Sequence, residues 1–90
     1  MKLNIKHEGW SAGHDCNVEI PDKFISTVNK ILNTGCLFGA RLYVTGMVEI
    51  FIYDPETKKK VFGMACNSIP IGDVKNPIII FLEDFEKFFL

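Results

Sequence analysis

The sequence predicts an α+β fold, in which an antiparallel sheet of four to five strands packs against two helices. Three observations predict it. Apolar residues alternate through residues 41–53, at Leu42, Val44, Val48, Ile50 and Ile52, and a second strand-like stretch follows a turn and ends at residue 69. Two further segments, one after residue 21 and one at the C-terminus, repeat apolar residues at helical spacing. A period of two marks a strand and a period of 3.6 marks a helix. The expected order of elements is β-β-α-β-β-(β)-α.

The N-terminal residues predict two paired strands. Residues 2–8 alternate, with Leu3, Ile5 and His7 on one face. Residues 9–15 contain two glycines and small polar side chains, which predicts a turn or an exposed loop. Residues 17–20 then predict a short strand that pairs back on the first.

A helix is predicted to begin at Pro21 and to end near Gly35. Proline is tolerated in the first helical turn because its missing N–H would have no partner there. Asp22 suits the positive end of the helix dipole. One apolar stripe follows at helical spacing, formed by Phe24, Ile25, Val28, Ile31 and Leu32. Gly35 can adopt the left-handed conformation that commonly ends a helix.

A long hairpin over residues 41–69 is predicted to form the centre of the sheet. Pairing of Asp54 with Lys59 would close a four-residue turn that contains proline. On one face this register gives the pairs Ile52–Val61, Ile50–Gly63, Val48–Ala65 and Val44–Ile69, and a slip of one residue would mix the two faces. Gly63 and Ala65 would form a shallow trough, on which we expect the first helix to dock.

The other face of this hairpin is more apolar and aromatic than a solvated face needs to be. In the same register it carries the pairs Phe51–Phe62, Glu49–Met64, Met47–Cys66 and Thr45–Ser68, with Tyr43 and Tyr53 at its ends. We expect a second helix, another copy of the chain or a protein partner to cover this face. Tryptophan and tyrosine are enriched at binding hot spots. The predicted partner-binding residues are Trp10, Tyr43, Met47, Phe51, Tyr53 and Phe62, although Trp10 could instead cover the end of a small core.

The C-terminal segment supports two interpretations. Residues 78–81 are β-branched or aromatic and therefore resemble a strand. A helical stripe overlaps them, formed by Phe81, Leu82, Phe85, Phe88 and Phe89. We favour a short strand that ends near Phe81 and is followed by a helix. The alternative is a single helix, capped by Asn76-Pro77, that runs to the end of the chain.

Length and composition predict a single domain over residues 1–90. The chain is 48% hydrophobic and 23% charged, with a net charge of −1, so it has no overall basic balance for holding nucleic acid. No apolar run approaches the roughly 18 residues of a membrane span, and the N-terminus is too polar for a signal peptide. We therefore expect a cytoplasmic protein that does not contact membranes.

Histidine and cysteine residues suggest two kinds of chemistry, neither strongly. His14, Asp15 and Cys16 have the residue types of nucleophilic catalysis, but adjacent residues rarely aim their side chains at one point. A zinc site would have to combine His7, His14 and Cys16 with Cys36 or Cys66, and no paired ligand spacing supports it. Three cysteines without pairing predict reduced thiols. We expect neither an enzyme nor a bound metal or other cofactor.

Lys58, Lys59 and Lys60 place three positive charges at the hairpin tip. A basic tip can contact phosphates, but charges at a tip also discourage edge pairing, and Asp54 and Glu56 lie alongside. The main functional hypothesis is a small protein-binding module that acts by stoichiometric binding through an aromatic sheet face. An inhibitor of the kind that phages or mobile elements encode fits this size. The alternative is a nucleic-acid-binding module that uses the three lysines.

Overall fold

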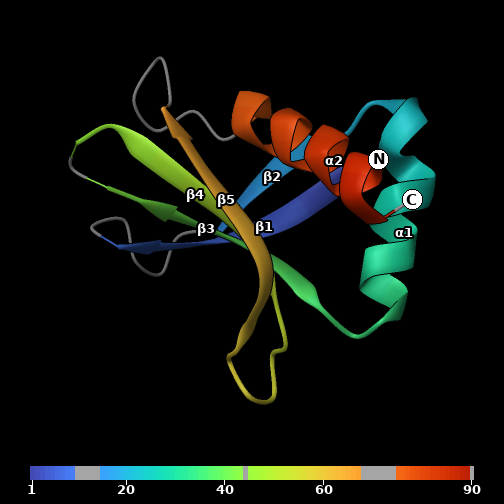
Figure 1. Cartoon of the computed structure of the whole chain (residues 1–90), viewed down its shortest axis with the longest axis horizontal. Coiled ribbons are helices and arrows are strands. Elements are labelled where there is room, and N and C mark those ends of the chain that lie inside the picture. The colour runs from blue at the N-terminus through green and yellow to red at the C-terminus, as the bar shows by residue number, and fades with distance from the viewer. Residues whose placement is uncertain (10–14, 44, 68–74, 90) are drawn as a thin grey trace.

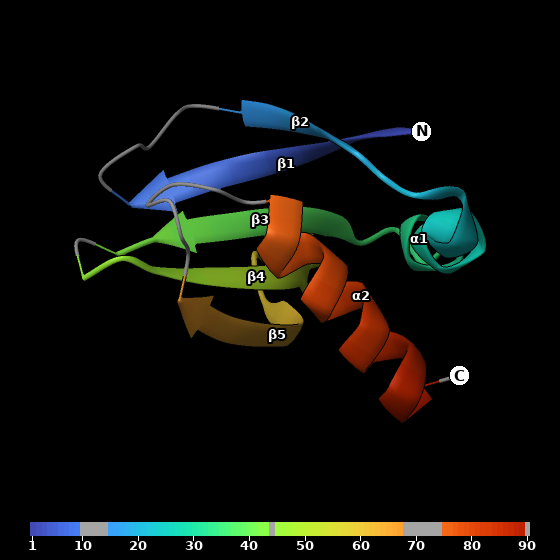
Figure 2. The same cartoon turned by 90° about the horizontal axis from the view of Figure 1, so that it is seen from above.

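The described part of the chain forms five strands and two helices. The computed structural model describes residues 1–9, 15–43, 45–67 and 75–89. In chain order the elements are β1 (Lys2–Gly9), β2 (Asp15–Glu19), a 3-10 turn (Asp22–Phe24), α1 (Ile25–Asn33), β3 (Leu37–Leu42), β4 (Met47–Tyr53), β5 (Lys60–Asn67) and α2 (Lys75–Phe89). Figure 1 shows these elements, and Figure 2 shows α2 crossing the sheet while α1 lies at one end of it. The predicted α+β class is confirmed.

The strands form one mixed sheet in the order β2-β1-β3-β4-β5. Three neighbouring pairs are antiparallel, but β1 and β3 run parallel. The prediction of a wholly antiparallel sheet is therefore wrong. Between β1 and β3 the chain passes through β2 and α1 before it re-enters the sheet. Parallel neighbours need a long crossover of this kind, whereas a tight hairpin joins only antiparallel strands.

The N-terminal hairpin is confirmed. β1 and β2 pair in a register that runs from Lys2 opposite Glu19 to Lys6 opposite Asp15. The alternating apolar residues Leu3 and Ile5 of β1, Val18 of β2 and Ile20 just after β2 are buried.

Residues 41–53 belong to two strands, and the prediction of one continuous strand is wrong. β3 ends at Leu42 and β4 begins at Met47. The Tyr43 amide donates to the Met47 carbonyl at 2.9 Å, and the Gly46 amide donates to the Tyr43 carbonyl at 2.9 Å. Gly46 has a φ of 93°, which glycine adopts without steric cost. A tight turn therefore interrupts the stretch. The alternation did not reveal it, because the apolar pattern continues on both sides.

The turn between β4 and β5 closes as predicted, with the Asp54 amide donating to the Lys59 carbonyl at 2.9 Å. Beyond the turn the predicted register is wrong. The pairing shifts at the step between Ile52 and Tyr53, so that Val61 has no opposite residue and Ile52 pairs with Phe62. One extra residue in one strand is the signature of a β-bulge. The predicted pairs Val44–Ile69 and Thr45–Ser68 involve positions outside the described residues.

The bulge exchanges the two faces of β5. Phe62 and Met64 lie opposite Ile52 and Ile50, on the face that the helices cover. Val61 is 61% exposed. Burying a phenylalanine stabilises a fold more than burying a valine, because the ring removes more apolar surface from water. This difference favours the bulged register.

The docking predicted for the first helix is wrong for the same reason. Gly63 and Ala65 are exposed on the face opposite the helices. The helix itself is confirmed, but its predicted start at Pro21 is wrong, because Asp22–Phe24 form a 3-10 turn and α1 begins at Ile25. The predicted apolar stripe buries Phe24, Val28 and Ile31 in the core. Gly35 follows its last residues with a φ of 90°, and its amide donates to the Leu32 carbonyl at 3.0 Å.

The C-terminal segment is a single helix, so the favoured short strand over residues 78–81 is wrong and the alternative of one helix is confirmed. The predicted cap is wrong, because the helix begins at Lys75 and includes Asn76 and Pro77 in its first turn. Ile78, Phe81 and Leu82 are completely buried at helical spacing. β-branched residues have only slightly lower helix propensity, and burial of a whole helical stripe outweighs that cost. The core between the sheet and the helices comprises Leu3, Ile5, Val18, Ile20, Phe24, Val28, Ile31, Phe38, Ala40, Val48, Ile50, Ile52, Ile78, Phe81 and Leu82.

The register makes a direct prediction about stability. Replacing Phe62 with alanine should lower the free energy of unfolding by about 3 kcal/mol, because a ring packed against α2 is lost. Replacing the neighbouring Val61 with alanine should change it by no more than about 0.5 kcal/mol. Urea denaturation of both variants measures the difference. A larger cost for Val61→Ala than for Phe62→Ala would contradict the bulged register.

Candidate functional site

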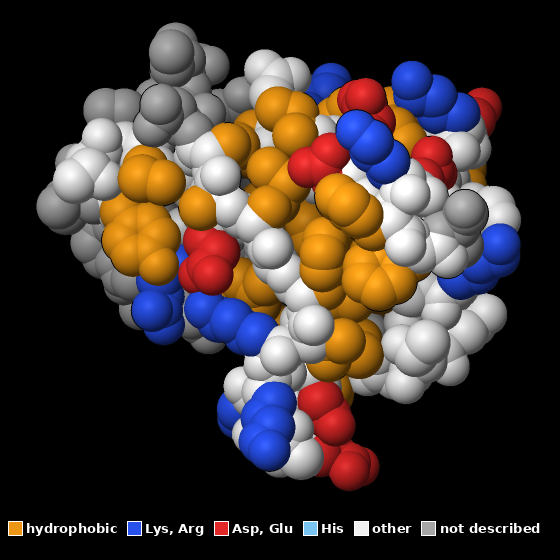
Figure 3. Space-filling view, in the orientation of Figure 1, with side chains coloured by type: hydrophobic (Ala, Val, Ile, Leu, Met, Phe, Trp, Pro, Cys, Tyr) orange, Lys and Arg blue, Asp and Glu red, His pale blue; other side chains and the backbone are white. Residues whose placement is uncertain are grey.

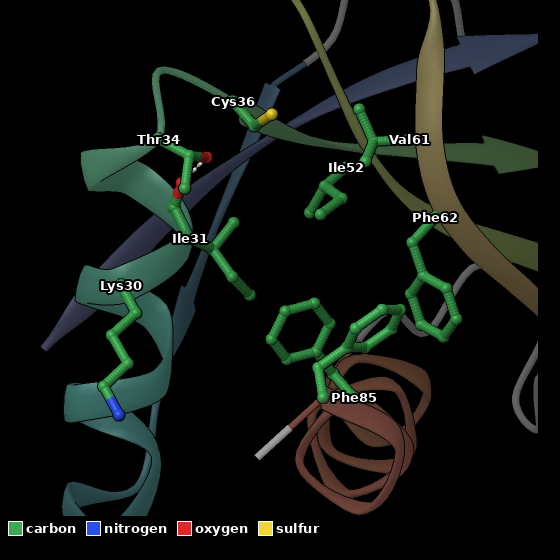
Figure 4. Close-up of a pocket in the computed structure, with 9 residues that line it drawn as sticks. Lys30, Ile31, Thr34, Cys36, Ile52, Val61, Phe62 and Phe85 are labelled. Atoms are coloured by element: carbon green, nitrogen blue, oxygen red, sulfur yellow. Dashed lines mark hydrogen bonds between the residues drawn. The ribbon is translucent and has the colours of Figure 1, made fainter.

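A groove of about 350 Å³ opens between the two helices and the β4–β5 hairpin (Figure 4). Its lining residues are Lys30, Ile31, Thr34, Cys36, Ile52, Val61, Phe62, Phe85 and Phe89. The C-terminal part of α1 forms one wall, the two strands form another, and α2 contributes two phenylalanines. We call this site the aromatic groove. Most of its lining is apolar, and Figure 4 shows the Lys30 side chain pointing away from the space.

Three phenylalanine rings build one side of the aromatic groove. Phe85 and Phe89 stack with their centroids 4.8 Å apart. Phe62 meets Phe85 at 5.8 Å and Phe89 at 5.1 Å, both edge-on. Offset and edge-on pairs of this kind attract one another beyond the apolar area they bury. The wall is therefore held together by the chain's own contacts.

The rim of the groove is unusually apolar for a surface. Two lining residues, Val61 and Phe89, are 61% and 57% exposed. Phe88, the chain neighbour of Phe89 on α2, is 69% exposed, and these three values are the highest among the large apolar side chains that the structure describes. Figure 3 shows hydrophobic side chains gathered over β5 and α2 on this side of the molecule. Contiguous exposed apolar surface commonly marks a site of interaction.

A hydrogen bond joins the two helices that flank the groove. The Thr27 hydroxyl of α1 donates to a Glu86 carboxylate oxygen of α2 at 2.5 Å. Thr27 is only 3% exposed, and Glu86 is half-buried. The bond lies where the two helices contact each other, and it therefore helps to set the width of the groove.

The groove has few polar groups, and the Thr34 hydroxyl among them already forms a hydrogen bond within the chain. The Thr34 hydroxyl donates to the Ile31 carbonyl at 2.6 Å. The Cys36 thiol is half-buried and lines the groove. A cavity of this size, with apolar walls and few polar groups, suits the binding of apolar side chains.

The opposite, uncovered face of the sheet carries four of the predicted partner-binding residues: Tyr43, Met47, Phe51 and Tyr53. The β-bulge places Phe62 on the helix-covered face instead. Trp10 lies outside the described residues. On the uncovered face Tyr43 is 39% exposed and Met47 38%. Their role in binding stays a prediction.

The Phe51 ring lies over Gly39, which has no side chain, and the ring is itself buried, with an exposed fraction of 3%. A Cβ atom on the neighbouring Gly39 would lie 2.6 Å from the Phe51 ring. The Tyr53 ring packs beside it at 5.8 Å, and the Lys60 ammonium lies 4.5 Å from the ring centroid. The same ammonium pairs with a Glu49 carboxylate oxygen at 2.8 Å. On this part of the uncovered face, neighbouring side chains therefore shield the Phe51 ring from solvent.

The lysines of the hairpin tip are exposed, as predicted for charges at a tip. Figure 3 shows basic and acidic side chains together on this protruding hairpin. Lys60 is paired with Glu49, which neutralises one of the three positive charges. Lys58 adopts a φ of 63° within the turn. Contact of Lys58, Lys59 and Lys60 with nucleic acid stays a prediction.

The described residues considered for catalysis or zinc binding lie in several different elements. Asp15 and Cys16 lie in β2, opposite Lys6 and Ile5, while His14 lies outside the described residues. His7 lies in β1. Within the described ranges, no group of three or more His, Cys, Asp or Glu side chains converges on a metal site. Burial raises the pKa of the Cys66 thiol, so less of it is in the reactive thiolate form at neutral pH.

Comparison with protein-family models, with curated proteins and with solved structures finds no match to this chain. None of the helices within the described ranges is long and apolar enough to cross a membrane.

The contact between Gly39 and Phe51 predicts a coupled effect on stability. Replacing Gly39 with alanine should lower the free energy of unfolding by about 1–3 kcal/mol, because the new methyl group overlaps the Phe51 ring. In a Phe51→Ala background the same substitution should cost much less. Urea denaturation of the four proteins of this double-mutant cycle measures the coupling. Equal costs in both backgrounds would show that the ring does not restrict this position.

The bond between the helices makes a second prediction. Glu86→Ala should lower the free energy of unfolding by about 1–3 kcal/mol, because the buried Thr27 hydroxyl loses its partner. Adding Thr27→Val should recover part of this loss, since no unpaired hydroxyl is then buried. Thermal and urea unfolding of the single and double variants test this. A double variant that is less stable by the sum of both single losses would contradict it.

Proposed function

We propose that the protein is a small protein-binding module that receives apolar side chains of a partner protein in the aromatic groove. The supporting observation is that Val61 and Phe89, which line a cavity of about 350 Å³, are each more than half exposed, as is Phe88 next to Phe89 on α2. Full burial of one such side chain is worth roughly 1.5–3 kcal/mol. A partner that covers all three therefore gains several such contributions.

The shape of the groove supports recognition by a few anchoring side chains. Hot spots of protein interfaces are aromatic or large apolar residues that enter well-packed pockets. The rings of Phe62, Phe85 and Phe89 already contact one another, so little ordering is required on binding. One groove per chain corresponds to stoichiometric binding. Inhibition of the bound partner, as an inhibitor from a phage or mobile element would cause, stays part of this proposal.

The experiment locates the binding surface by substitution and by cross-linking. A photo-reactive phenylalanine analogue at position 88 should cross-link to a partner protein in the source cell, and the same analogue at position 47 should not. Binding of the partner identified in this way is then measured by titration. Phe88→Asp and Phe89→Asp should each weaken it at least tenfold, because a carboxylate replaces buried apolar surface.

Met47→Asp is the matched control, since Met47 is an exposed apolar residue on the uncovered face. It should leave the affinity unchanged, and circular dichroism should show that all three variants fold. Loss of binding in Met47→Asp alone would move the site to the uncovered face. Binding that nuclease or moderate salt abolishes would favour the lysine tip and nucleic acid, because phosphate contacts weaken steeply as salt rises.

A further inference from the structure

β5 is an edge strand of the sheet. In the order β2-β1-β3-β4-β5 it pairs with β4 on one side, and none of the described strands pairs with its other side. Free N–H and C=O groups along an edge form a template for another strand. Natural edges are usually protected by lysines, prolines, bulges or a short length. β5 has eight residues, and its bulge protects only the end beside the hairpin tip.

The two edges of the sheet differ in charge. β5 has no charged residue from Val61 to Asn67. The opposite edge, β2, has five residues, of which Asp15 and Glu19 are acidic. If β2 paired antiparallel with the β2 of another copy about Asn17, Asp15 would lie opposite Glu19 of that copy. Like charges directly opposite each other are destabilising, so this edge resists self-pairing.

The β5 edge has no such obstacle. Antiparallel pairing about a two-fold axis at Met64 places Phe62 opposite Cys66 of the copy, and Gly63 opposite Ala65. Each pair joins residues on the same face of the sheet, because side chains alternate along both strands. A two-fold contact brings each residue opposite another residue of the same strand, with Met64 alone facing its own counterpart, and an uncharged strand places no like charges together in this arrangement. The edge is therefore self-complementary.

We propose that two copies of the chain pair along β5 about this two-fold axis, joining their sheets into one continuous sheet. The contact lies at the sheet edge, not on the uncovered face. The seven uncharged residues form a contact smaller than the roughly 800 Å² per partner of a standard interface, so the dimer is in reversible, concentration-dependent equilibrium with the monomer. Because the axis is perpendicular to the sheet, both aromatic grooves lie on the same side of the dimer.

Sedimentation equilibrium of the whole chain tests the proposal. The wild-type protein should show a monomer–dimer equilibrium. Ala65→Lys should weaken the dimer at least tenfold, because two added positive charges meet close to the axis. Asn17→Lys is the matched control, since Asn17 is equally exposed, lies on the same face and occupies the other edge strand. It should leave the dimer unchanged. A monomer at every concentration, or a dimer that Ala65→Lys leaves intact, would overturn the proposal.

A cross-link tests the position of the axis. In a variant with Cys16, Cys36 and Cys66 replaced by serine or alanine, Met64→Cys should oxidise to a covalent dimer. Directly opposed residues of antiparallel strands have Cα atoms about 4.5–5.5 Å apart, within disulfide range. The same background with Asn17→Cys should stay monomeric. If Asn17→Cys cross-links and Met64→Cys does not, the edge is wrong.

The dimer and the partner-binding groove are tested separately. Phe88→Asp should leave sedimentation unchanged, and Ala65→Lys should leave the affinity of one groove for its partner unchanged. Failure of one proposal would therefore not be mistaken for failure of the other.

Discussion

The structure depends on the burial of the Phe62 ring against α2. The ring contacts Phe81 at 5.5 Å and reaches Phe85 and Phe89 further along the helix. The ring faces the helices because Val61 is an extra residue in β5, with no opposite residue in β4. This one shift sets the pairing of β4 with β5, positions α2 across the sheet and builds a wall of the aromatic groove. It also exposes Val61 at the rim of that groove, so the contact that stabilises the fold also shapes the candidate binding site.

The abundance of phenylalanine has three separate physical roles. Phe24, Phe38 and Phe81 are buried in the core. Phe51 lies on the uncovered face and fills the space that Gly39 leaves, so its surface is used within the molecule. Phe88 and Phe89 remain exposed at the end of α2. A large number of aromatic residues in a sequence therefore does not by itself indicate a binding surface. Rings that fill the core or pack over a glycine must first be set apart from those that remain exposed. This assignment moves the proposed binding site from the sheet face to the groove.

Features that depend on neighbouring residues were predictable. The N-terminal hairpin, a helix between Pro21 and Gly35 and the closure of the turn from Asp54 to Lys59 all follow from short-range rules of alternation, capping and turn chemistry, although α1 itself begins only at Ile25. Gly46 itself was a local signal, since an isolated glycine within a strand pattern suggests an irregularity, but the apolar alternation on both sides of it favoured a continuous strand. The parallel pairing of β1 with β3 was not predictable, because no local pattern records which distant strand becomes a neighbour.

The sequence by itself determined the α+β class, the amphipathic first helix and the period-two pattern of the strands, because each arises from residues a few positions apart. Only the tertiary structure decided the bulge, the strand order and the helical state of residues 78–81. In each case the intrinsic conformational preference of a few residues competes with the burial of a whole apolar face. Burial contributes more free energy than that preference does. The aromatic groove belongs to the second group, since it joins Ile31, Phe62 and Phe89 from distant parts of the chain. Its local trace in the sequence is the helical repeat of Phe85 and Phe89, which extends beyond the residues that the core buries.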